Sequence, residues 1–140
     1  MVIDKTLQVS AGQVLVASAP STHVVDVGPR PAPVGGVVEP IALSGVISGN
    51  AATASTLSVK IRNGSDPGNM AAGTVVGRGD LALTDGAVFE VQVTADLLRH
   101  RYLDAYFEIA GSDPSVIISA FFGPRGMSQQ LTAYANAVDF

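Results

Sequence analysis

The chain has 140 residues, of which 47% are hydrophobic and only 14% charged, with a formal net charge of -4. This length suits one domain with a core large enough to fold without cross-links, and the absence of cysteine excludes disulfides, thiolate metal sites and cysteine nucleophiles. The eight basic residues are scattered rather than clustered, which argues against nucleic-acid binding, and no apolar run approaches the roughly 18 residues of a membrane span. Residues 1–5 lack the basic-then-apolar layout of a secretory signal.

The charged fraction is low for a monomeric protein, since charged residues usually make up about 25% of a chain. A chain this poor in charge, with Lys5 and Lys60 as its only lysines, is expected to hide part of its surface against other subunits. The composition therefore favours assembly.

Short runs rich in valine, isoleucine and threonine alternate with glycine and proline, a pattern typical of a β-sandwich or barrel. In the run at 56–62, Leu57, Val59 and Ile61 face one way and polar residues the other. The run at 87–93 repeats this alternation. The pattern predicts strands at 13–19, 23–27, 37–47, 56–62, 74–83, 87–93, 101–110, 115–122 and 128–135.

Turn residues separate these runs. Asn63-Gly64 begins a polar loop that ends at Gly68, Asp85-Gly86 suits a tight hairpin, and residues 111–114 form a third turn. The proline-rich segment 29–33 cannot lie inside a sheet, so it is expected to connect sheets or form an exposed loop. Only residues 94–100 are predicted to form a helical turn.

These elements predict an all-β fold: a jelly-roll or Greek-key sandwich of about eight strands with at most one short helical turn. Residues 1–140 are expected to form this single domain. Whether residues 1–12 extend from this domain as an N-terminal arm is not decided by the pattern.

No constellation of residues supports catalysis or metal binding. His23 and His100 are far apart in the sequence, and a jelly-roll metal site needs a close histidine pair with further ligands, so both are interpreted as structural. Glu90 and Glu108 are expected on neighbouring strands, where two solvated sheet faces are a better interpretation than an acid–base pair. We therefore expect no enzyme activity, no cofactor and no metal.

Two further features of the sequence are candidate contact sites. Arg78-Gly79-Asp80 spells a tripeptide that integrins bind, but chance occurrence is the favoured explanation. Tyr102 and Tyr106 share one strand face with acidic residues; they lie either on an ordinary polar face, which is favoured, or on a partner-binding surface.

The chain ends are unusually apolar, with Val2 and Ile3 at one end and Phe140 at the other. They either reach a neighbouring subunit as an added strand or fold back as edge strands of their own sandwich. The two interpretations carry equal weight.

Several motifs, in order, resemble the Bordetella-phage-type capsid cement proteins. The first is Ile3-Asp4-Lys5-x-Leu7-x-x-Ser10-x-x-Gln13, and the second runs from Ala17 to Gly28 through Ser21-Thr22 and Val25-Asp26. Arg101-Tyr102-Leu103, followed by an aromatic pair and Ala110-Gly111, is the third, and Ser119-Ala120 is the fourth. Residues 29–90 match only in general character.

The resemblance implies a jelly-roll protein without enzymatic activity. It would be made in the bacterial cytoplasm and would bind the major capsid protein on the outer capsid surface of the virion. Homo-oligomers are implied, a dimer first and a trimer second, with no nucleic-acid or membrane partner. The alternative is a carbohydrate- or receptor-binding β-sandwich of a phage virion, which the absence of tryptophan disfavours.

Overall fold

The computed structural model describes residues 7–27, 41–49, 53–94 and 98–124. Within these ranges the chain forms nine strands and one 3-10 turn, η3 (Met70–Ala72). The strands are β1 (Gln8–Leu15), β2 (Ala19–Pro20), β3 (Val25–Asp26), β4 (Ile41–Ser48), β5 (Thr56–Gly64), β6 (Thr74–Asp80), β7 (Val88–Gln92), β8 (Tyr102–Ala110) and β9 (Val116–Pro124).

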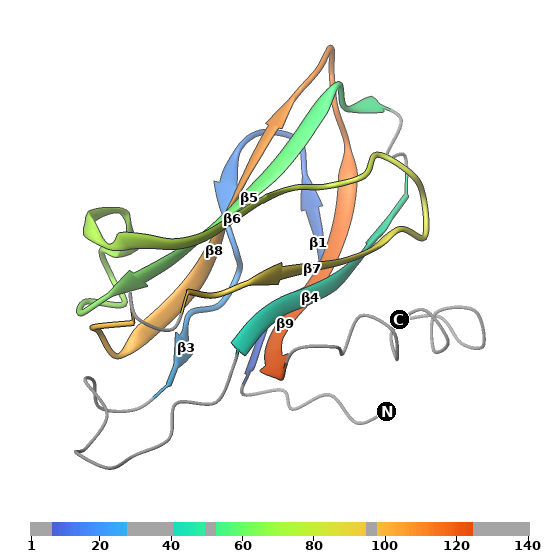
Figure 1. Cartoon of the computed structure of the whole chain (residues 1–140). Helices are drawn as coiled ribbons and strands as arrows, with labels where there is room; N and C mark the ends of the chain where they lie inside the picture. The colour runs from blue at the N-terminus through green and yellow to red at the C-terminus, as the bar shows by residue number, and fades with distance from the viewer. Residues whose placement is uncertain (1–6, 28–40, 50–52, 95–97, 125–140) are drawn as a thin grey trace.

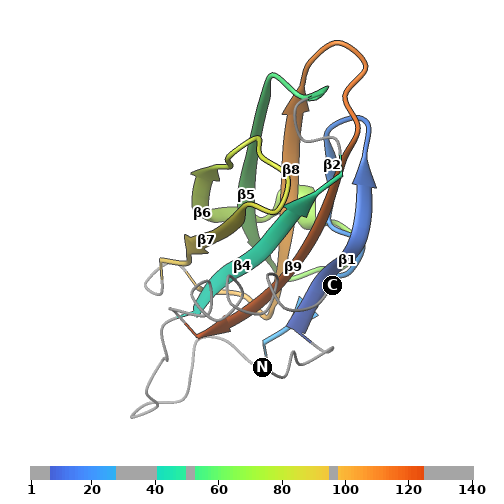
Figure 2. The ribbon, with the colours of Figure 1, turned by 90° about the vertical axis from the view of Figure 1, so that its right-hand side faces the viewer.

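The strands form two antiparallel sheets that pack face to face (Figure 1). Sheet A has the order β1-β9-β4-β7, and Figure 2 shows these four strands side by side. Sheet B has the order β2-β8-β5-β6, and β3 pairs with β8 beyond β2. The predicted all-β sandwich is confirmed.

The strand pairing is that of a jelly roll. Because β2 and β3 both pair with β8, at 106–107 and 102–103, they act as one interrupted strand. The chain then pairs first with last (β1 with β9), second with seventh (β2 and β3 with β8), third with sixth (β4 with β7) and fourth with fifth (β5 with β6). This nested pairing is produced when one long hairpin wraps into two sheets.

The core lies between the inner faces of the two sheets. Leu57, Val59 and Ile61 of β5 are buried, as the alternation predicts, and in β7 the inward residues Phe89 and Val91 are buried too. Each such side chain contributes about 1.5–3 kcal/mol relative to full exposure. The largest fully buried side chains are Phe107, Phe122, Leu15, Leu43, Ile47, Ile61, Leu103 and Ile118.

Two predicted elements differ in the structure. The strand expected at 13–19 is wrong: β1 runs from Gln8 to Leu15 and the chain bends at 16–18. Register shifts on both sides of Ser10, together with a positive φ of 62° at Gly12, interrupt the alternation that would have revealed this strand. Residues 8–12 of the expected N-terminal arm thus belong to the chain's own sandwich.

The turn at Asp85-Gly86 exists, with φ of 82° at Gly86, but it does not join a hairpin. It lies on the connection between β6 of sheet B and β7 of sheet A. The chain therefore crosses between sheets where the local pattern predicted that it would turn back within one.

The helical turn in the described part of the chain lies at Met70–Ala72. In the segment 94–100, where a helical turn was expected, 95–97 fall outside the described residues, and Thr94 and 98–100 are not helical. The proline-rich segment 29–33 and the strand expected at 128–135 also lie outside the described residues. The turn at 111–114 is confirmed, and it links β8 of sheet B to β9 of sheet A.

Candidate interaction faces

The outer faces of the two sheets differ sharply in charge. Every lysine and arginine in the described part of the chain lies on β5 or β6, or in the short segment before β8. The four strands of sheet A carry a single charged residue, Glu90. Among the described residues, the fold therefore places every lysine and arginine on the sheet B side of the sandwich.

The centre of the outer face of sheet B is held by a partly buried ion pair. Arg62 donates from Nε and Nη2 to the two carboxylate oxygens of Asp104, at 2.8 and 2.6 Å, and the side chains are only 13% and 2% exposed. The guanidinium lies 5.0 Å from the centre of the Tyr106 ring, within the range of a cation–π contact. The hydrogen bonds to Asp104 raise the pKa of Arg62 above its ordinary value, so this charge stays on.

Two more ion pairs neutralise charge on the same side. Lys60 and Glu108 meet at 2.5 Å across β5 and β8, and Arg101 donates to Asp26 from two nitrogens, both at 2.8 Å. The hydrogen bonds to Asp26 raise the pKa of Arg101. The side chains of both pairs are one third to one half exposed, so neither pair is expected to contribute much to stability.

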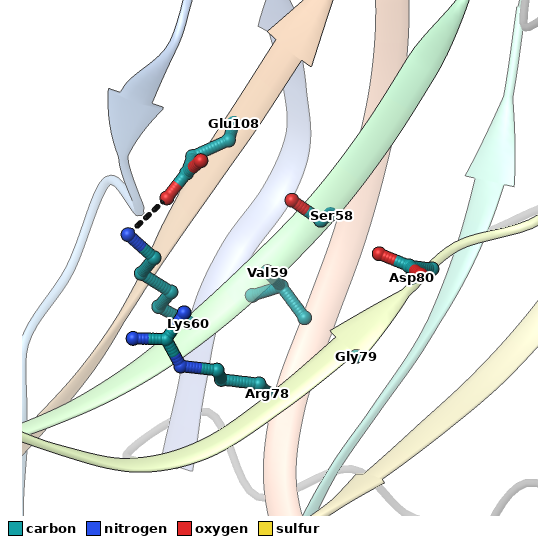
Figure 3. A pocket seen from close by; sticks show the side chains of 7 residues that line it. All are labelled: Ser58, Val59, Lys60, Arg78, Gly79, Asp80 and Glu108. Atoms are coloured by element: carbon teal, nitrogen blue, oxygen red, sulfur yellow. Dashed lines mark ion pairs between the residues drawn. The ribbon is translucent and has the colours of Figure 1, made fainter.

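A shallow depression of about 410 Å³ lies on this face between β5, β6 and β8 (Figure 3). Arg78 and Asp80 project from β6 on either side of Gly79, and Lys60 and Glu108 form the opposite wall. Two cations and two anions make the lining neutral overall. It has no aromatic side chain on which a sugar ring would stack.

The Arg78-Gly79-Asp80 tripeptide lies inside β6, not at a turn. Gly79 faces inward, where an added Cβ would lie 2.8 Å from Val91 of β7. Its neighbour Gly77 is under the same constraint, since a Cβ there would lie 2.6 Å from the carbonyl oxygen of Gln92. Glycine is needed at these positions because the edges of the two sheets approach closely, which gives the tripeptide a structural explanation.

The outer face of sheet A is poor in charge and carries several apolar side chains. The large hydrophobic side chains exposed in the described part of the chain are Val14 in β1 and Val16 directly after β1, at 57% and 64%. Val14 pairs with the half-buried Ile117 of β9. Further along this face, Val46 and Phe121 are buried although they point away from the core.

Ser44 lies on this same outer face, in register with Glu90 on one side and Phe121 on the other. It is fully buried, and its hydroxyl has no hydrogen-bond partner. An unpaired buried hydroxyl costs about 1–3 kcal/mol. The fold gives no explanation for burying this hydroxyl without a partner.

The outer edge of β1 is closed by hydrogen bonds to the segment that follows it. On the outer edge of β1, the Val9 carbonyl accepts the His23 N–H at 2.9 Å. The Gln13 side chain donates to the Pro20 carbonyl at 2.9 Å and accepts from the Thr22 N–H at 3.2 Å. Such blunting protects this edge of sheet A from edge-to-edge association.

The most heavily bonded side chain was missed by sequence reasoning, which placed Asn63 at the start of a polar loop. Asn63 is fully buried at the end of β5. Its Nδ2 donates to the carbonyls of His100 and Tyr102, at 2.8 and 2.9 Å, and its Oδ1 accepts from the N–H groups of Arg99 and His100, at 3.0 and 2.8 Å. We call these four hydrogen bonds the Asn63 clamp.

The tyrosines and glutamates singled out in the sequence lie on the sheets, and the chain ends do not belong to the described part. Tyr102 and Tyr106 lie on the outer face of sheet B, both half-buried, and the Tyr106 ring is occupied by Arg62. Glu90 and Glu108 belong to different sheets, so the expectation that they occupy neighbouring strands is wrong. Val2, Ile3 and Phe140 lie outside the described residues.

Within the described ranges, no three histidine, aspartate or glutamate side chains gather as metal ligands would. None of the helical structure described there is long and apolar enough to cross a membrane.

A family model named Bbp16 matches residues 9–121, which span β1 to β9. The chain belongs to the Bbp16 family. This is a family of Bordetella phage proteins, so the expectation of a phage protein is confirmed at that level. No curated protein matches the chain.

Proposed function

We propose that this Bbp16-family chain is a capsid cement protein, a non-enzymatic homo-oligomer that binds the outer surface of the major capsid protein lattice and stabilises the shell. A dimer is our first choice and a trimer our second. The observation that carries the proposal is the outer face of sheet A, whose strands carry Glu90 as their single charge, with Val14 exposed on β1 and Val16 exposed directly after it. Membership of a phage protein family supports it.

The chemistry of sheet A suits a contact surface. The buried centres of protein interfaces are depleted in charged residues, because each charge would have to be desolvated. A face whose strands carry only Glu90 avoids that cost. Sheet B, with three ion pairs on its side of the sandwich, suits a face that stays in water.

A two-layer sandwich is also mechanically suited to cementing. Its ladders fix the positions of the contact side chains, and the closed edge of β1 prevents uncontrolled strand addition. Contact of the capsid with Tyr102 and Tyr106 on sheet B stays a prediction, and capsid decoration by variants tests it.

The test is decoration of purified capsids. Gradient-purified particles should contain the chain at a fixed copy number relative to the major capsid protein. Capsids lacking the chain should bind the added protein to saturation and then resist heat disruption better. Absence of the chain from particles, together with no binding to bare capsids, would contradict the proposal; binding to a glycan array instead would favour the carbohydrate-binding alternative.

Substitutions on each sheet show which of the two outer faces binds the capsid. Val14→Asp combined with Val16→Asp should abolish decoration while leaving the melting temperature of the free protein nearly unchanged, since both side chains are mostly exposed. Thr84→Asp, in the exposed turn between β6 and β7, is the matched control. If the valine variant decorates fully and Tyr102→Ser does not, the contact lies on sheet B.

A further inference from the structure

The dipeptide Asn63-Gly64 carries a reactivity that the fold suppresses. In a flexible chain, the backbone nitrogen of a glycine attacks the side-chain Cγ of a preceding asparagine. The new N–Cγ bond closes a five-membered succinimide ring, the Cγ–Nδ2 bond breaks, and ammonia leaves with the proton of the glycine N–H. Water then opens the ring at either carbonyl, leaving aspartate or isoaspartate. Glycine favours this reaction because it has no side chain to hinder ring closure.

The folded chain holds Asn63 in an arrangement that blocks each step. Asn63 and Gly64 lie in β5 and pair with Leu103 and Tyr102, so the backbone is fixed in an extended conformation. The four hydrogen bonds of the Asn63 clamp hold the side-chain amide away from ring closure. The side chain is fully buried, which excludes the water that hydrolysis requires.

The products cannot rebuild the clamp. Aspartate at position 63 would have no Nδ2–H groups and would place carboxylate oxygens against the carbonyl oxygens of His100 and Tyr102, now 2.8 and 2.9 Å from Nδ2. A charge buried against two acceptors is strongly unfavourable. Isoaspartate would in addition insert a methylene group into the backbone of β5 and shift the end of its ladder.

We propose that Asn63 is a deamidation site that the fold keeps closed, and that its modification makes prolonged unfolding irreversible. The reaction proceeds only while the segment before β8 is detached from Asn63. A chain that deamidates in that open state cannot close again. This inference does not depend on the proposed function.

The experiment follows mass gain in the full chain, incubated in mildly alkaline buffer with and without urea. Cleavage after Arg62 and Arg78 releases residues 63–78, which contain Asn63 and the exposed Asn69 in one peptide. Deamidation adds one mass unit, and fragment ions show which asparagine has changed. Digestion in mildly acidic buffer keeps the reaction from continuing during handling.

In urea, Asn63 should deamidate much faster than Asn69, which precedes Met70 rather than a glycine. In the native protein, deamidation of Asn63 should be slower than in urea by at least about tenfold, because it waits for local opening. Equal rates at Asn63 in the native and the unfolded protein would overturn the proposal.

Refolding tests whether deamidation of Asn63 makes unfolding irreversible. The fraction of wild-type chain that refolds after dilution from urea should fall with incubation time, in step with the mass gain at Asn63. Gly64→Ala should slow both. Its added Cβ would lie 3.2 Å from the sulfur of the flexible Met70 side chain and 3.7 Å from Gly73 Cα, which is ordinary contact. If the modified wild-type chain refolds fully, or if Asn63→Asp melts within about 2 °C of the wild type, irreversibility does not arise at this site.

Discussion

Removing Asp104 tests whether burial makes the Arg62–Asp104 ion pair at the centre of sheet B costly to break. In the wild type the Arg62 side chain is 13% exposed, and two of its N–H groups donate to the Asp104 carboxylate. Asp104→Ala leaves these two N–H groups without that acceptor. Breaking a buried pair in this way costs about 3–5 kcal/mol. Contact with the Tyr106 ring persists and offsets part of this loss, so we expect about 3 kcal/mol.

The assay is urea unfolding followed by circular dichroism, with an unchanged slope as evidence that the unfolded state is the same. Combining Asp104→Leu with Arg62→Met removes both charges and should cost less than Asp104→Ala alone, since the penalty comes from the stranded guanidinium. Glu108→Gln is the matched control. It breaks the Lys60–Glu108 pair, whose side chains are 33% and 40% exposed, and should cost less than about 1 kcal/mol. Equal losses in Asp104→Ala and Glu108→Gln would refute the reasoning.

Three other substitutions address single contacts, each measured by the same unfolding assay. Asn63→Ala should cost about 2–5 kcal/mol because four buried hydrogen bonds are lost, whereas Asn69→Ala, at an exposed position of the β5–β6 loop, should be nearly neutral; similar effects of the two would contradict the clamp. Gly45→Ala should cost about 2 kcal/mol or more, because its Cβ would lie 2.4 Å from the Ser119 carbonyl oxygen, and a neutral result would mean that the β4–β9 pairing is looser than described. Ser44→Ala should stabilise the free protein by up to about 1 kcal/mol, since it removes an unpaired buried hydroxyl; a loss of stability would show that the hydroxyl is hydrogen-bonded.

Residue alternation made much of the sandwich predictable. In β5 and β8, apolar and polar residues alternate strictly enough for the buried faces to be assigned from residue order alone. Such alternation is local, because successive side chains of a strand point to opposite sides whatever the strand pairs with. The same reasoning failed at β1, where the irregular register around Gly12 breaks the alternation.

The candidate interaction faces were predictable only in part. Scarcity of charge predicted a surface covered by other subunits, but did not predict which surface. Nothing in the local sequence shows that Glu90 and Glu108 lie in different sheets, or that Asp85-Gly86 joins one sheet to the other. A turn signal reports a change of direction and not the sheet to which the next strand belongs.

The sequence by itself determined the strand content, most of the inward-facing residues and the low charge of the chain, because these depend on residue type and on neighbours along the chain. Only the tertiary structure decided which strands became partners. That pairing buried Asn63, required glycine at position 79 and sorted the described lysines and arginines onto the sheet B side. Each of these features depends on residues distant in sequence, and the contact between them exists only once the chain has folded.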